Sequence, residues 1–159
     1  GEPVMSADAI TQVPAADWAQ AAASLVTDGF VCLDLLVGID RGSEREVLLR
    51  AVSPDSGDMR AIATRVPAGE PMLASVVASF PAAAWPEREA AEMLGLTFDG
   101  HPDPRPLLRR SLAGGPPLLK DSVLATRAVV PWPGTAEPGG SPSRRRHLPP
   151  GVPADWGQS

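Results

Sequence analysis

Few groups that hold metals or bind cofactors covalently are present in this chain of 159 residues. It has one cysteine, Cys32, and two histidines. A single thiol excludes a disulfide within the chain, a four-thiolate iron–sulfur cluster and a cysteine-rich zinc site. Cys32 lies in the apolar run FVCLDLLV, so we expect it to be a small buried hydrophobic residue rather than a reactive thiol.

Long apolar runs, phosphate-binding loops and an excess of positive charge are also absent. No run approaches the ~20 apolar residues that a membrane-spanning helix needs, so we expect no direct membrane insertion. No basic segment followed by an apolar one opens the chain, and we therefore expect no secretory signal. The net charge of −5 argues against a nucleic-acid partner.

Proline and glycine, in contrast, are plentiful, with nineteen and fifteen copies. Many lie after residue 100, and each proline favours extended geometry in the residue before it. We therefore expect a folded first part and an extended second part. The predicted organisation is a flexible N-terminus over 1–13, an α+β domain over 14–98, an extended partner-binding segment over 99–133 and a Pro/Gly/Arg-rich tail over 134–159.

Local patterns predict an α+β fold, in which an N-terminal helix and a small antiparallel sheet with helices packed on it precede the extended part. Apolar periodicity, turn residues and prolines at helix starts define the elements. In chain order they are a helix over 15–27, strands over 30–37, 46–52 and 59–66, and helices over 71–79 and 86–94. Short connections predict that the strands form an antiparallel meander. Both faces of the first strand are largely apolar, which is typical of a central strand.

Residues 85–108 combine a short charged helix with a proline-rich exit, in the sequence WPEREAAEMLGLTFDGHPDPRPLL. Glu87 lies in the first turn of the predicted helix, where negative charge complements the helix dipole by up to ~1 kcal/mol. Arg88 and Glu92 are one turn apart and can pair on the helix surface. Gly95 follows as a left-handed cap that ends the helix.

In this stretch the chain resembles the thirty-kilodalton subunits, lettered C, of NADH-quinone oxidoreductase, which is respiratory complex I. That family has Glu-Arg-Glu, an acid three residues later and two apolar residues, followed at set spacings by a histidine, a basic residue and two aliphatics. The matching positions are Glu87-Arg88-Glu89, Glu92, Met93-Leu94, His101, Arg105 and Leu107-Leu108. A second segment, Pro117 to Asp121, is similar to the family's Pro-Leu-Arg-Lys-Asp, with Leu119 where an arginine is usual.

The resemblance implies a non-catalytic peripheral-arm subunit that supports electron transfer from NADH to quinone. It implies no cofactor on this chain, with NADH, flavin, iron–sulfur clusters and quinone on partner subunits. The implied partners are the large quinone-site subunit and a neighbouring cluster-binding subunit, on the cytoplasmic side of the bacterial cell membrane. The family motif and expected subunit interface comprise Glu87, Arg88, Glu89, Glu92, Gly95, Gly100, His101, Pro102, Asp103, Arg105, Lys120 and Asp121.

Two other assignments stay open from the sequence. The chain could be the equivalent subunit of a related membrane-bound hydrogenase-type complex, or a free-standing small α+β domain with its own ligand or activity. Two tryptophans in the proline-rich part, Trp132 and Trp156, are interpreted as anchors for a partner, because interface hot spots favour tryptophan.

A metal or acid–base site built from these carboxylates and His101 is the remaining alternative for the charged stretch. Glu87 and Glu89 are two residues apart on a helix and therefore point about 160° away from each other. The second histidine, His147, lies in the tail. We therefore predict no catalytic residue and no metal ligand on this chain.

Overall fold

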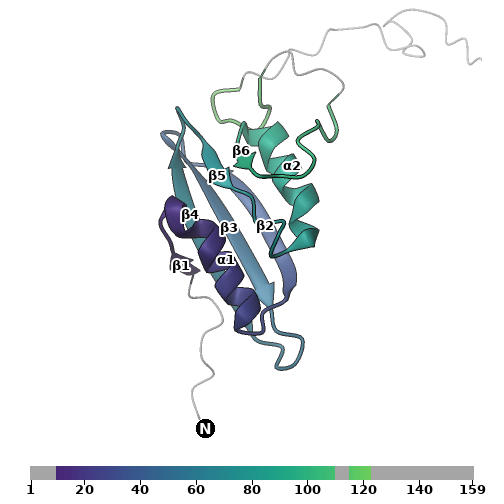
Figure 1. Ribbon diagram of the computed structural model, residues 1–159. Coiled ribbons are helices and arrows are strands. Elements are labelled where there is room, and N and C mark those ends of the chain that lie inside the picture. Colours follow the sequence, from purple (N-terminus) through teal and green to yellow (C-terminus); the bar gives the residue numbers. More distant parts are fainter. Residues whose placement is uncertain (1–9, 110–114, 123–159) are drawn as a thin grey trace, which may run out of the picture. The chain divides into compact units, whose positions relative to one another are not determined.

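The computed structural model describes residues 10–109 and 115–122, and these residues form an α+β fold (Figure 1). Four strands, in the spatial order β1-β4-β3-β2, make the main sheet, and β5 pairs with β6 in a second, two-stranded sheet. The strands are β1 (Ile10–Gln12), β2 (Cys32–Asp40), β3 (Glu44–Val52), β4 (Met59–Pro67), β5 (Met72–Ala74) and β6 (Thr97–Asp99). The helices are α1 (Trp18–Thr27) and α2 (Ala84–Leu94), preceded by the 3-10 turns η1 (Ala15–Asp17) and η2 (Pro81–Ala83). The predicted fold class is confirmed.

The antiparallel meander is confirmed by the pairing of β2 with β3 and of β3 with β4. Residues 10–12, which the sequence placed in a flexible N-terminus, instead form β1 and pair with β4 in parallel, with Ile10 opposite Ala61. A strand of three residues is too short to show an alternating pattern. Its pairing partner is also about fifty residues away, so no local signal predicts it.

β2 lies at the edge of the sheet, so the prediction of a central strand is wrong. The register between β2 and β3 shifts between Leu33 and Leu35, which is a β-bulge. The bulge exchanges the two faces of the strand, because side chains otherwise alternate strictly. Cys32, at the start of this strand, is exposed, and its predicted burial is therefore also wrong.

Both helices pack on the same face of the main sheet (Figure 1). α1 buries Trp18, Ala22 and Leu25, which share one stripe of the helix. Trp18 and Phe80 are among the largest fully buried side chains of the core. The helix stops at Asp28, and Gly29 follows with a φ of 92°, as the predicted left-handed cap requires.

The helix predicted over 71–79 is wrong. Residues 72–74 form β5, which pairs in parallel with β6, and the backbone then turns back toward α2. The N–H of Ser75 donates to the carbonyl of Asp99, and the N–H of Val76 donates to the Glu87 carboxylate. Distant partners therefore satisfy the backbone groups that a local helix would have paired internally.

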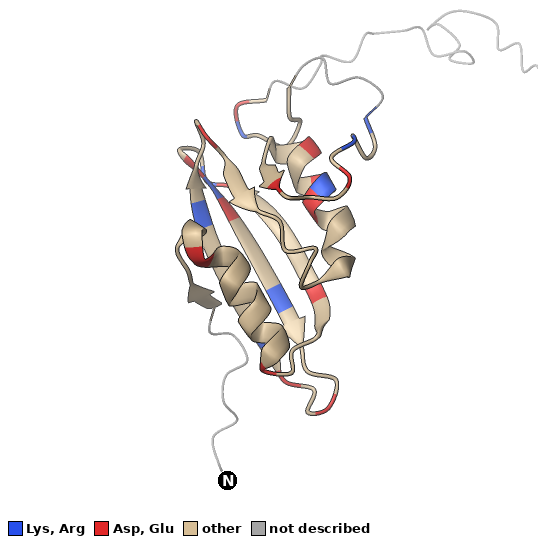
Figure 2. Cartoon of the chain, in the orientation of Figure 1, with Lys and Arg blue, Asp and Glu red and all other residues tan. Residues whose placement is uncertain are grey.

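α2 crosses β2 closely at Gly38. A Cβ atom added there would lie 2.5 Å from Cδ1 of Leu94, which is too close for a carbon–carbon contact. Gly95 ends the helix with a φ of 71°, so the predicted cap is confirmed. α2 also carries segments of both charge signs, seen as red and blue ribbon in Figure 2. No helix within the described residues is long and apolar enough to cross a membrane.

Candidate functional site

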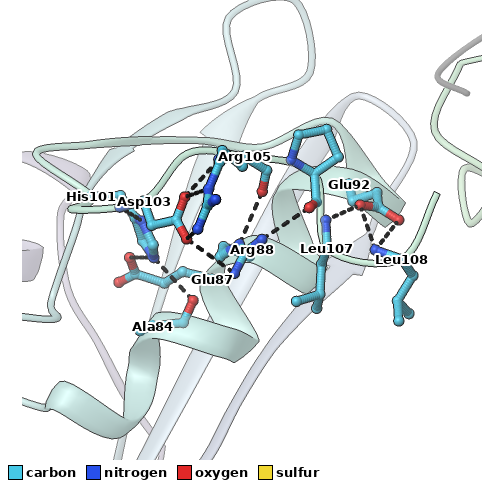
Figure 3. Close-up of polar contacts among 10 residues, drawn as sticks. Ala84, Glu87, Arg88, Glu92, His101, Asp103, Arg105, Leu107 and Leu108 are labelled. Atoms are coloured by element: carbon cyan, nitrogen blue, oxygen red, sulfur yellow. Dashed lines mark hydrogen bonds and ion pairs between the residues drawn. The ribbon is translucent and has the colours of Figure 1, made fainter. Parts of the chain in front are cut away.

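The charged side chains of α2 hold residues 101–109, which we call the strap, against the domain (Figure 3). They do so mainly through hydrogen bonds to the strap's backbone. The site is built from one element with regular geometry, the helix, and one proline-rich segment that lacks internal pairing. The described side chains bearing on the strap are therefore best understood as anchors for the polypeptide.

Glu87 is the buried centre of the site, with no exposed surface. Its carboxylate accepts a 2.6 Å hydrogen bond from the Ser75 hydroxyl and a 2.7 Å bond from the Val76 N–H. Burial raises the pKa of Glu87 above its usual value, although these two donors oppose the shift. The carboxylate thus joins α2 to the turn after β5.

His101 fixes the start of the strap. Its Nδ1 accepts a 2.9 Å hydrogen bond from the N–H of Asp103, so the ring hydrogen lies on Nε2. Nε2 in turn lies 3.0 Å from the carbonyl oxygen of Ala84, to which it donates. The distance from Nε2 to the Glu87 carboxylate is 3.9 Å, beyond a direct hydrogen bond. Both ring nitrogens are therefore used in binding backbone groups.

Arg88 holds the middle of the strap. Its guanidinium donates hydrogen bonds of 2.9 Å to the carbonyls of Arg105 and Pro106, and it lies 3.4 Å from the Asp103 carboxylate. Asp103 also forms a two-pronged pair with Arg105, whose side-chain hydrogen bond is the main reason that the pKa of Asp103 lies far below its usual value. Arg88 does not pair with Glu92, so that expectation from helical spacing is wrong.

Glu92 holds the end of the strap. Its carboxylate accepts hydrogen bonds from the three consecutive N–H groups of Leu107, Leu108 and Arg109, at distances between 2.5 and 3.1 Å. Burial alone would raise the pKa of Glu92, but these donors stabilise the charged form and lower it below its usual value. A carboxylate in this position replaces the hydrogen bonds that an irregular backbone cannot make internally.

A second anchor, which sequence reasoning missed, lies at the end of β2. One oxygen of Asp40 accepts hydrogen bonds from the Gly42 N–H and from Arg45, and the other accepts a 2.7 Å bond from the N–H of Lys120. The pKa of Asp40 is lowered, first by the Lys120 N–H and then by that of Gly42. The Asp-Arg-Gly turn was visible in the sequence. Its eighty-residue reach to Lys120 was not.

Near the anchors, Leu118 donates its N–H to the carbonyl of Met93. The segment 115–122 is therefore tied both to the last turn of α2 and to β2. Leu108 and Leu118 each have their N–H bonded to the same helical turn, and their side chains are more than 60% exposed. Two anchored segments thus display large apolar side chains to solvent, as a docking surface requires.

A cavity of about 400 Å³ lies between α2, β6 and the strap. Its lining includes Ala91, Leu96 and Phe98, together with Glu87 and His101. Among the described side chains that line it, no buried nitrogen or oxygen lacks a hydrogen-bond partner. The part of the chain that the structure describes contains no group of three or more acidic, histidine or cysteine side chains able to hold a metal. The arrangement orders backbone and offers no unengaged acid–base pair.

Of the twelve predicted interface residues, the structure joins Glu87, Arg88, Glu92, His101, Asp103 and Arg105 into this site. Lys120 contributes its backbone N–H, and Gly95 and Gly100 have the positive φ angles of turns, 71° and 78°. Glu89 is exposed and makes no hydrogen bond or ion pair with any described residue. Pro102 and Asp121 are exposed. Trp132, Trp156, His147 and the tail lie outside the described residues.

Replacing Glu92 with glutamine is expected to release the end of the strap without unfolding the domain. An amide has one acceptor oxygen, and its NH₂ group would face the N–H donors of Leu107, Leu108 and Arg109. Hydrogen exchange at these three amides should accelerate roughly tenfold or more. Glu89→Gln is the matched control and should leave the exchange unchanged. Equal protection in the two variants would show that Glu92 does not hold the strap.

Comparison with known proteins gives a consistent result. The model of the respiratory-chain NADH dehydrogenase 30 Kd subunit family matches residues 11–128. The NAD(P)H-quinone oxidoreductase subunit J of Parasynechococcus marenigrum (strain WH8102) is 37% identical over 117 residues, covering 64% of this chain and 62% of that protein. An NADH-quinone oxidoreductase subunit of Rhodobacter capsulatus, the one lettered C, is 48% identical over 60 residues, covering 36% and 30%.

Among solved structures, the trypsin-resistant fragment of Nqo5 superimposes with a TM-score of 0.55 at 28% identity, covering 58% of this chain and 79% of the fragment. Fold and site together define a small α+β protein whose polar cluster binds its own backbone. The chain belongs to the respiratory-chain NADH dehydrogenase 30 Kd subunit family. It spans less than two thirds of the length of the curated relatives first matched.

Proposed function

We propose that this chain is a non-catalytic peripheral-arm subunit of an NADH-quinone oxidoreductase. In this proposal it supports electron transfer from NADH to quinone by docking on the large quinone-site subunit and on a neighbouring cluster-binding subunit. NADH, flavin, iron–sulfur clusters and quinone bind to those partners, on the cytoplasmic side of the bacterial cell membrane. Membership of the family, and the names of its relatives as subunits of quinone oxidoreductases, support this reading.

The observation that carries the proposal is the use to which the charged motif is put. Three helix side chains, Glu87, Arg88 and Glu92, spend their polar atoms on backbone groups. Ordering a proline-rich segment costs conformational entropy, about 1–2 kcal/mol per residue for the backbone. A chain that orders such a segment in advance lowers the cost of binding a partner along it. This use favours a docking subunit over a free-standing enzyme.

The test is co-purification of the tagged chain with the other subunits from its own cells. The parent is expected to recover the quinone-site and cluster-binding subunits. Arg88→Ala removes the guanidinium that bonds two strap carbonyls, and should weaken assembly about tenfold, equivalent to ~1.4 kcal/mol.

The control is Glu89→Gln, which changes charge on the same helix without touching the strap. It should assemble as well as the parent. His101→Ala tests the start of the strap in the same way. If Arg88→Ala and His101→Ala both assembled like the parent, the strap would not be the docking element. If the parent itself recovered no other subunit, the chain would not belong to such a complex.

A further inference from the structure

The face of the main sheet that points away from the helices is apolar. On β3, Val47 and Leu49 are fully buried on the helix side, so Leu48 between them points the other way. The register places Leu48 opposite Val37 on one neighbouring strand and opposite Ala63 on the other. We call this surface the back face. Its central side chains are Leu35, Val37, Ile39, Leu48, Val52 and Ala63.

The back face is separate from the core beneath the helices. Ala63 is buried but is not part of the core cluster formed around Trp18 and Phe80. Val37 and Leu48 are only partly buried. Both helices lie on the opposite side (Figure 1). An antiparallel sheet with one solvated face normally alternates apolar and polar residues, and this one does not.

The charges of the back face balance and lie toward its ends. Asp34 pairs with Arg50, and Glu46 is flanked by Arg41 and Arg65. Glu44 approaches Arg65 as well, which makes three acidic and three basic side chains. In Figure 2 most of the strand ribbon is tan. A surface without net positive charge does not attract anionic lipid or nucleic acid, and it suits an uncharged protein surface.

The size of the back face distinguishes among protein partners. Four strands about 4.8 Å apart, over the seven residues from Glu46 to Val52, cover roughly 400–500 Å². A self-standing pair of proteins typically buries about 800 Å² on each partner. This face alone is therefore too small to hold a second copy of the chain. It suits one contact among several within a larger assembly.

We propose that the back face docks on a flat, uncharged, aliphatic surface of a neighbouring subunit, in addition to the contacts made by the strap. The inference rests on the proposed function, since it needs an assembly that holds both contacts. It also accounts for the apolar character of both faces of β2. That strand is at the edge of the sheet, and its second apolar face is covered when the neighbour binds.

The chain carries its own reporter for this contact. Cys32 is the single cysteine, it is exposed, and it lies at one end of the back face, opposite Val52. Maleimide labelling of Cys32 is expected to be at least ~10-fold slower in the assembled complex than in the isolated chain. In a Cys32→Ser background, Gln20→Cys on the exposed side of α1 is the control and should label at nearly equal rates in both.

A charge at the centre of the face provides the second measurement. Leu48→Lys should melt within a few degrees of the parent but recover a neighbouring subunit at least ~5-fold less well, whereas Gln20→Lys should recover it fully. Unchanged labelling of Cys32 together with full recovery by Leu48→Lys would overturn the inference. A parent that is dimeric alone and a Leu48→Lys variant that is monomeric would also overturn it, because a second copy would then cover the face.

The two proposals fail differently in these experiments. If Arg88→Ala loses the partners and Leu48→Lys keeps them, the strap docks and the back face does not. If the parent recovers no partner, the proposed function itself is wrong. A variant that does not fold is replaced by the labelling of Cys32, which uses the unaltered chain.

Discussion

Glu87→Ala is expected to lower the free energy of unfolding by about 3–5 kcal/mol, the largest effect of any single change in the site. The alanine removes the acceptor of the Val76 N–H and of the Ser75 hydroxyl, both within 2.7 Å of the carboxylate. An unpaired N–H is then buried, and a void replaces a side chain with no exposed surface. Urea unfolding monitored by far-ultraviolet circular dichroism measures the loss.

Glu87→Gln separates the charge of this group from its volume. Folding raises the pKa of Glu87 above the usual 4.5, so the folded chain holds the proton more tightly than the unfolded chain does. The stabilisation by Glu87 is therefore fully present below about pH 4.5 and declines as the pH rises through the folded pKa. The stability advantage of the parent over Glu87→Gln should be larger at pH 4 than at pH 7. An advantage that grew with pH would mean that the site favours the charged form.

Gly38→Val is expected to destabilise the chain by about 3 kcal/mol and to displace α2 from the sheet. The added Cβ would lie 2.5 Å from Cδ1 of Leu94 and 3.1 Å from Cδ1 of Leu96. Both leucines are buried, so they have little room to move away. Thermal unfolding measures the loss. Because α2 holds the strap, recovery of partner subunits should fall with it.

Gly69→Val is the matched control for this substitution. A Cβ at Gly69 would meet no atom within 4 Å, and this glycine lies in the turn between β4 and β5. Its replacement should change the melting temperature by no more than a few degrees. If Gly38→Val were equally mild, the close approach of α2 to β2 would not be a fixed feature of the fold.

Much of the local structure could be predicted because it depends on neighbours along the chain. The stripe of Trp18, Ala22 and Leu25 defines α1, and Gly95 marks the end of α2. The regular run of apolar residues in β3 and β4 likewise predicts their pairing. The errors occur where a distant segment decides, as at β5, whose residues pair with β6 rather than forming the helix that Pro71 indicated.

The candidate site shows the same division. The spacing of Glu87, Arg88 and Glu92 named the family. On helical geometry alone, however, Arg88 and Glu92 should pair, and they do not. Each finds a better partner in the strap, since backbone groups without a regular ladder must be satisfied by side chains. Asp40 belongs to the same network. It was missed because its partner, Lys120, is eighty residues away.

The amino-acid sequence by itself determined the family, the fold class and the helix that carries the charged motif, because each depends on residue types at short, regular spacings. Tertiary structure alone decided what the motif does. The burial of Glu87, the anchoring of the strap and the exposure of Cys32 all depend on long-range packing and on the bulge in β2. Few cysteines, histidines and charges of one sign could exclude chemistry in advance. The assignment of the remaining polar groups to backbone required the folded chain.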